Sequence, residues 1–310
     1  MAHLRIYNPD HQTIYTLGEL FETEIVPRRP FWDPRTLAEY ASTVHLWTQI
    51  TGDPPITEID EKLIASFSAT LLRRPGKHAQ TTLSRNTVRK HLQHLKAVLR
   101  SLGPKSTRGI GLLKEIPIIE APRPARRPVT VFSLTQVRSL ADGAEYFRTD
   151  LTRPIPSQEW WKSLIRILYN LAWRIGTALQ VRWEWIDGNW ITVPPEATKP
   201  KEIGRRYYLN QAVMAALDPI RRNSGRIFPW NGAMLSLQRW RRRIAAKAGI
   251  PVDDRFGFHC LRRTSLSAIA MINPLVARMV AGHAIHDVLA EHYISDDVIR
   301  ATLEQLPQPW

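Results

Sequence analysis

The chain has 310 residues, a formal net charge of +15 and a sequence pI of about 10.3. A surplus of this size favours a polyanionic partner such as nucleic acid, because binding to phosphates releases condensed counterions. A merely basic surface is the alternative. A hydrophobic content of 44% and a charged content of 23% exclude a disordered chain.

Membrane and redox features point to the cytoplasm. The sequence has no run of eighteen apolar residues, so we expect no membrane span. The opening "MAHLRIYNPDHQ" lacks the apolar stretch of a secretory signal. Cys260, the single cysteine, excludes an intrachain disulfide and a cysteine-cluster zinc site.

A proline-rich stretch divides the chain. Four prolines between residues 115 and 131 prevent one continuous helix there and predict an extended linker. Ser133 and Gln136 follow with the spacing of a capping box, which opens a new helix. We therefore expect two domains, residues 1–128 and 129–310, in keeping with the chain length.

The first domain is predicted to be helical. Apolar residues recur at helical spacing in 35–47, 60–72 and 84–103, with Asp60 as a cap and Gly103 as a stop. The third helix also carries a basic stripe within about 60° of its circumference. Such a stripe can lie along a DNA backbone, with a solvated face as the alternative. Its residues are Arg85, Arg89, Lys96 and Arg100.

The second domain is predicted to be mainly helical with a small sheet. Residues 160–187 contain two buried helical stretches, and 236–250 form a strongly basic helix. "NWITV" and "RRYYLN" are short β-prone runs that indicate a hairpin. Further helices follow to the C-terminus.

Polar residues in the second domain suit phosphoryl transfer without a metal. That chemistry needs fixed positive charge on the non-bridging oxygens, an acid for the leaving oxygen and a nucleophile. Arginine supplies the first because its planar, permanently charged guanidinium can bind two phosphate oxygens at once. Lysine or histidine can supply the second, and Ser, Tyr or His the third.

Four motifs in this domain resemble those of the tyrosine recombinase (phage integrase) family. "LAWRIGTALQVRWEWID" is similar to the family's first arginine motif, and "ATKP" to its hairpin lysine. "HCLRRT" matches H-x-L-R, and "AGHAIHDVLAEHYI" matches the G-H motif with its tyrosine. The matching site residues, in chain order, are Arg174, Lys199, His259, Arg262, His283 and Tyr293.

The resemblance covers nearly the whole chain and implies both fold and reaction. It implies a helical core-binding (SAM-like) domain followed by a mostly helical catalytic domain with a small antiparallel sheet. Tyr293 is expected to form a covalent 3′-phosphotyrosyl link, while Arg174 and Arg262 clamp the phosphate. His259 assists deprotonation of the phenol, Lys199 protonates the leaving oxygen, and His283 donates a further hydrogen bond. Lys201 could exchange roles with Lys199.

The same resemblance implies partners and location. It implies a site-specific recombinase of the integrase, resolvase or transposase type, often from a mobile element, that acts without metal, ATP or another cofactor. Its partners are double-stranded DNA, further copies in a tetramer on DNA, and accessory DNA-bending proteins. A nucleoid-associated cytoplasmic protein follows. A non-catalytic DNA-binding descendant and a type IB topoisomerase-like enzyme are the alternatives.

Two positions depart from the family pattern. Thr177 stands where the family usually has an acidic residue that supports the site. The spacing of ten between His283 and Tyr293 is one longer than usual. In a connecting turn the extra residue is tolerable, whereas within a helix it rotates the tyrosine by about 100°.

The tail after Tyr293 predicts a short amphipathic helix. Ser295 caps it, and Val298, Ile299, Leu303 and Leu306 share one side. A helix of about ten residues is marginal alone, so it must dock. As in the family, we expect it to pack on a neighbouring protomer, with docking on its own domain as the alternative.

Overall fold

The protein folds into two compact units, Met1–Arg127 and Pro128–Trp310, each with its own hydrophobic core. The computed structural model describes residues 15–76, 80–123, 129–198, 204–251, 257–282 and 294–310. None of the helices in these ranges is long and apolar enough to cross a membrane.

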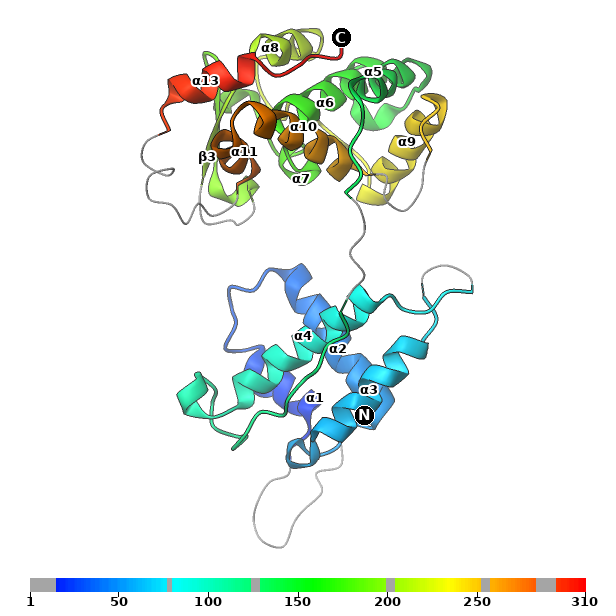
Figure 1. The fold of residues 1–310 in the computed structure, drawn as a ribbon, viewed down its shortest axis with the longest axis vertical. Helices are drawn as coiled ribbons and strands as arrows, with labels where there is room; N and C mark the ends of the chain where they lie inside the picture. Colours follow the sequence, from blue (N-terminus) through cyan, green and yellow to red (C-terminus); the bar gives the residue numbers. More distant parts are fainter. Residues whose placement is uncertain (1–14, 77–79, 124–128, 199–203, 252–256, 283–293) are drawn as a thin grey trace, which may run out of the picture. The chain divides into compact units, whose positions relative to one another are not determined.

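The N-terminal unit is a helical bundle. Buried side chains of three long helices, among them Trp47, Phe67, Leu71, Leu92 and Leu95, fill its core. The three helices expected from the sequence are all present, and a short capped turn at the start is an addition. The helices are α1 (Leu17–Leu20), which a π-helical turn at Phe21–Ile25 extends, α2 (Pro34–Thr51), α3 (Glu61–Arg73) and α4 (Arg85–Leu102) (Figure 1).

Local capping sets these helix ends. The Asp60 carboxylate accepts a 2.7 Å hydrogen bond from the backbone N–H of Leu63, as the sequence predicts. Gly103 ends α4, although its backbone is extended instead of left-handed. The left-handed glycine cap occurs at Gly52, after α2.

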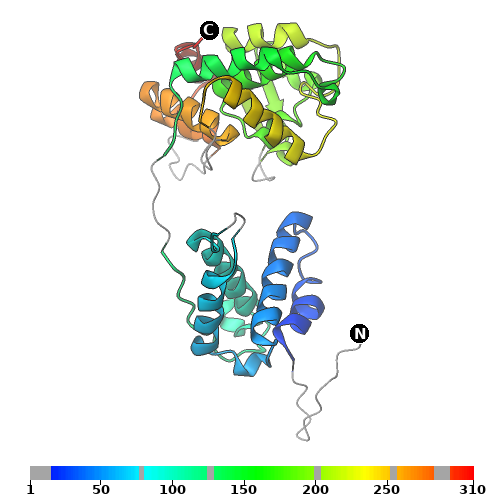
Figure 2. The ribbon, with the colours of Figure 1, turned by 90° about the vertical axis from the view of Figure 1, so that its right-hand side faces the viewer.

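The C-terminal unit is built around one buried helix, α6. Trp160, Trp161, Leu164, Leu168 and Tyr169 of this helix are fully buried, and α5, α8 and α10 pack around it (Figures 1 and 2). The bounds are α5 (Leu134–Gly143), α6 (Ser157–Leu171), α7 (Ile175–Ala178), α8 (Gln211–Leu217), α9 (Met234–Lys247), α10 (Phe258–Ile272), α11 (Pro274–Ala281) and α13 (Asp296–Glu304).

A small antiparallel sheet completes this unit. The predicted hairpin is present as β2 (Trp190–Val193) and β3 (Arg205–Tyr208), with Ile191 opposite Tyr207. A third strand, β1 (Ile186–Asp187), pairs with β2 on its other edge. The predicted fold class, mainly α with a small antiparallel sheet, is confirmed.

The C-terminal tail packs on its own unit. Ser295 caps α13 as predicted, and Leu303 and Leu306 are each 2% exposed within the core. Asn210 donates to the Leu303 carbonyl at 2.8 Å, and Tyr169 donates to the Pro307 carbonyl at 2.6 Å. In this structure the tail therefore adopts the alternative, docking on its own domain, instead of the expected packing on a neighbouring protomer, and α13 contacts α10, α11 and β3.

Candidate active site

Arg174 follows a sharp reversal of the chain. The helix α6 ends at Ala172, a fully buried residue in the left-handed region with φ +48°. A non-glycine residue in that conformation is strained and must be held by its surroundings. Two residues later, Arg174 is the N-cap of α7, and its backbone carbonyl accepts a 2.9 Å hydrogen bond from the N–H of Thr177. The turn thus fixes the backbone of Arg174.

Arg262, on α10, is a buried arginine that ties three segments together. It is 5% exposed, and it donates one hydrogen bond to the Ala172 carbonyl and another to the Ala281 carbonyl at 2.5 Å. Burial, and then the charge of Arg174, lower its pKa to about 10. The guanidinium is therefore still cationic at neutral pH.

His259 lies one helical turn before Arg262, in the first turn of α10. Its pKa is lowered by burial and then by the charges of Arg263, Arg262 and Arg174. Each of these effects disfavours the imidazolium, so the neutral ring predominates at neutral pH and can accept a proton.

A pocket of about 340 Å³ brings Arg174 and His259 together. Its wall also contains two residues of α9 that the sequence reasoning missed, Gln238 and Arg241. A signal for Arg241 was present, because it falls between Leu237 and Ile244 on the buried side of that helix. The remaining lining residues are Trp173, Ile175, Gly257 and Phe258.

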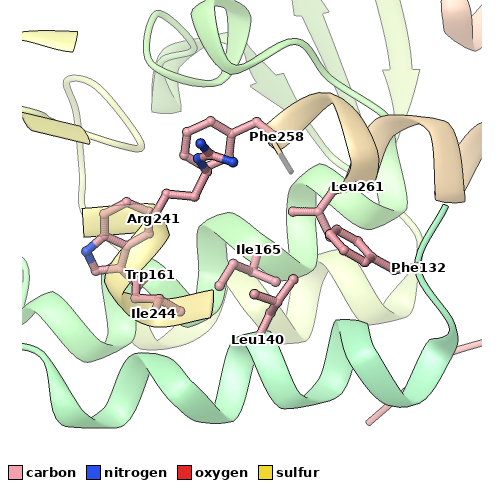
Figure 3. Close-up of a pocket in the computed structure, with 9 residues that line it drawn as sticks. Phe132, Leu140, Trp161, Ile165, Arg241, Ile244, Phe258 and Leu261 are labelled. Atoms are coloured by element: carbon pink, nitrogen blue, oxygen red, sulfur yellow. The ribbon is translucent and has the colours of Figure 1, made fainter. Parts of the chain in front are cut away.

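A small apolar cavity lies at the start of α10 and shares Arg241, Gly257 and Phe258 with this pocket. The cavity has water-accessible space of only about 10 Å³. In Figure 3 the Arg241 guanidinium lies over the Phe258 ring, 5.5 Å from its centroid, among apolar side chains. Burial, then the charge of Arg242, lower the pKa of Arg241 to about 10. Close packing here fixes the turn that carries His259.

Two residues of β3 also lie among the arginines. Tyr207 is buried, which raises the pKa of its phenol, while the charges of Arg205, Arg262 and Arg174 act in the opposite direction. Arg205 in turn contributes to the lowered pKa of Arg262. The sequence reasoning assigned no role in the site to Arg205.

Solved structures share this arrangement of elements. A lambda integrase dimer bound to a COC′ core site matches with 18% identity and a TM-score of 0.67, over 92% of this chain and 78% of that one. A lambda integrase tetramer bound to a Holliday junction matches with 16% identity and a TM-score of 0.65, over 91% and 78%. The Tn1549 transposon integrase with transposon right-end DNA matches with 14% identity and a TM-score of 0.65, over 94% and 99%.

The chain has the tyrosine recombinase fold. No protein-family model matches the sequence, and neither does any curated protein. The similarity therefore lies in the fold, at sequence identities below 20%.

Within this recombinase fold, three of the six predicted site residues are described. Arg174 lines the pocket beside His259, and Arg262 follows His259 on α10, where the charge of Arg174 lowers its pKa. Lys199, His283 and Tyr293 lie outside the described residues, as does the segment that contains the longer spacing. Their predicted roles remain predictions. Thr177, at the usual acidic position, is 7% exposed in α7.

The predicted DNA-binding stripe lies on α4 of the N-terminal unit. Arg85 and Arg100 are exposed, and Arg89 and Lys96 are half-buried beside the apolar face. None of the four forms an ion pair with a carboxylate in the described ranges. In the part of the chain that the structure describes, no group of three or more His, Cys, Asp or Glu side chains could hold a metal ion.

Proposed function

We propose that the protein is a site-specific DNA recombinase that cuts and rejoins double-stranded DNA through a covalent 3′-phosphotyrosyl intermediate, without metal or ATP. The proposal is carried by Arg174 and His259, which line one pocket, together with Arg262, which lies one helical turn after His259 and whose pKa is lowered by the charge of Arg174. Arg174 is far in the sequence from the pair on α10, His259 and Arg262. A fixed cluster of guanidinium groups needs an anionic partner or ordered dipoles.

In this proposal each described residue has a distinct task. Arg174 and Arg262 bind the non-bridging oxygens of the scissile phosphate and stabilise the charge that develops there. His259 accepts the phenolic proton, a role that its lowered pKa favours because the free base is present at neutral pH.

The remaining steps belong to residues outside the described ranges. The oxygen of Tyr293 attacks phosphorus, and the bond from phosphorus to the 5′ oxygen breaks. Lys199, or Lys201 in its place, gives a proton to that 5′ oxygen, and His283 donates a hydrogen bond to the phosphate. The new phosphotyrosyl ester preserves the phosphodiester's energy, so a 5′ hydroxyl can later attack it and restore the DNA.

In this proposal the two units have different functions. Residues 1–128 are the core-binding domain, with the α4 stripe on the DNA backbone, and residues 129–310 are the catalytic domain. The full reaction requires several copies on DNA, in keeping with the lambda integrase tetramer on a Holliday junction. Since α13 packs in cis, we place the surfaces that join the copies elsewhere on the chain.

A covalent-trapping assay tests the reaction. A nicked duplex loses its short 5′-hydroxyl fragment after cleavage, which traps the protein on DNA as a band resistant to denaturant. Tyr293→Phe should give no adduct yet bind DNA with the wild-type Kd, since only the nucleophilic oxygen is lost. Tyr208→Phe is the matched control, because the Tyr208 hydroxyl donates to Glu304 at 2.8 Å.

The outcomes separate the alternatives. An adduct in Tyr293→Phe points to Tyr207 or another nucleophile. No adduct with the wild type, on DNA that it binds specifically, identifies a non-catalytic DNA-binding protein. Relaxation of supercoiled DNA without sequence preference identifies a topoisomerase-like enzyme.

A modified substrate assigns the acid. When sulfur replaces the 5′ bridging oxygen, the leaving thiolate needs no proton, so loss of the acid becomes harmless. We expect Lys199→Ala to cleave this substrate at the wild-type rate but ordinary DNA about 10²-fold or more slowly. Lys201→Ala is the matched control, and rescue of Lys201→Ala instead assigns the role to Lys201.

A further inference from the structure

Arg205, the first residue of β3, holds the end of the helix α11. Its Nη2 donates to the Gly282 carbonyl at 3.1 Å, and its Nη1 donates to the Met279 carbonyl at 3.5 Å. The last carbonyls of a helix have no partner within the helix and carry partial negative charge. A guanidinium is thus suited to this place on electrostatic grounds.

Gly282 is what allows the arginine to come so close. It has φ +64°, in the left-handed region. A Cβ atom at this position would lie 2.5 Å from Cζ of Arg205 and from its Nη1. Any larger residue would therefore be strained in its backbone and would displace the guanidinium.

Arg262 binds the neighbouring carbonyl. Its Nη2 donates to Ala281, the residue before Gly282, so two guanidinium groups sit on consecutive carbonyls of one helix end. Arg174 and Arg205 both lower the pKa of Arg262 by their charge. The charges of Arg174 and Arg205 therefore both act on Arg262, and no described carboxylate is among the charges that act on it.

A group of like charges is stable only with an anion or with ordered dipoles close by. The carbonyls of α11 meet part of this need. The Arg205 guanidinium still has an unused donor, since its Nε is buried and has no hydrogen-bond partner in the part of the chain that the structure describes. A phosphate suits such a site because it accepts several charge-assisted hydrogen bonds.

We propose that Arg205 is a third arginine of the phosphate-binding site, held on the end of α11 so that its charge adds to those of Arg174 and Arg262. The identification of the anion as a DNA phosphate rests on the proposed recombinase function; the anion site itself rests on the contacts of Arg205. Arg205 stabilises charge on the non-bridging oxygens, whereas a merely structural arginine would only hold α11 in place.

Two substrates distinguish charge stabilisation from support of the fold. In one, the scissile phosphate is a normal diester; in the other, a methyl group replaces one non-bridging oxygen and removes the negative charge. We expect Arg205→Met to slow single-turnover adduct formation on the diester by about 10²-fold. On the methylphosphonate the deficit should shrink to within about threefold, because less charge needs stabilisation.

Matched variants complete this experiment. Arg205→Lys keeps the charge and should recover part of the rate on the diester. Arg206→Ala is the control on the same strand, because Arg206 is exposed, pairs with Asp296 and lies over Trp190. It should cleave both substrates at wild-type rates. Equal loss on both substrates in Arg205→Met, or no loss on either, overturns the proposal.

A measurement without DNA separates this inference from the recombinase function. Inorganic phosphate that binds the folded protein raises its Tm by mass action. We expect a smaller rise in Arg205→Met and Arg174→Met than in the wild type, and an unchanged rise in Arg206→Ala. If the wild type forms no DNA adduct but this pattern holds, the recombinase proposal fails and the anion site stands. If the wild type cleaves DNA while Arg205→Met matches it in both assays, only the role of Arg205 fails.

Discussion

Replacing Leu303 by alanine tests the docking of the C-terminal helix α13 on its own unit. Leu303 is 2% exposed, and its backbone carbonyl accepts a hydrogen bond from Asn210, which is itself buried. Truncating a buried leucine to alanine costs about 2–5 kcal/mol, from lost burial and from the cavity that remains. Each kcal/mol shifts Tm by about 2–4 °C in a unit of this size, so Tm should fall by roughly 4–20 °C.

Thermal and urea unfolding, followed by tryptophan fluorescence, measure this change. Val298→Ala on the same helix is the control, since Val298 is 39% exposed and its truncation should cost less than about 1 kcal/mol. With cis docking, neither Tm depends on protein concentration. If the effect of Leu303→Ala appears only at concentrations where the protein self-associates, the helix docks on a second copy and the reasoning is refuted.

Three further predictions concern pH, salt and metal. Burial, followed by the charges of Lys90 and His94, lowers the pKa of His91 to about 4, so the unfolded chain takes up a proton there before the folded one does. The contribution of His91 to the free energy of unfolding should be fully present above about pH 6.5 and should be lost as the pH falls toward 4. In urea titrations, a His91→Leu variant should show a shallower decline of the free energy of unfolding over this range. DNA affinity should fall with salt, and Arg89→Ala or Arg100→Ala should each reduce the slope of log K against log[salt] by about 0.9. Arg300→Ala is the control and should leave the slope unchanged, because Arg300 pairs with Asp297. Equal slopes in all variants would identify the α4 stripe as a solvated face. Adduct formation should persist in excess EDTA, and its loss on chelation overturns the metal-free reaction.

Local patterns in the sequence predicted most of the helices correctly. Ser133 with Gln136, and Asp60 with the N–H of Leu63, form the expected caps, because capping depends on residues that are neighbours in the chain. The periodicity of buried residues placed α2, α3 and α4 for the same reason. The stretch after α6 was harder to predict from the sequence. The buried left-handed Ala172 ends α6, and the predicted second helix after it is only the four residues of α7.

Contacts between distant segments were beyond the sequence. Arg205 and Gln238 stand in basic runs that do not mark them out, and only the contact of Arg205 with the end of α11 and the pocket that contains Gln238 distinguish them. For Arg241, the spacing from Leu237 and Ile244 indicates a buried position but not the pocket that it lines. The direction of tail docking was likewise hidden. Apolar spacing predicts that α13 buries one side, but burial against α10, α11 and β3 and burial against another copy produce the same pattern.

Thr177 acquires a physical meaning once the arginines are in place. In this chain the buried charge of Arg262 is held by the carbonyls of Ala172 and Ala281, which are dipoles at the ends of two helices. Dipoles fix a guanidinium without neutralising it, whereas the carboxylate usual in the family at the Thr177 position carries a full negative charge. In the proposed recombinase site, the guanidinium therefore keeps its full positive charge for a phosphate. The threonine also makes the geometry of the cluster depend on the backbone turns at Ala172 and Gly282, which a carboxylate could otherwise help to hold.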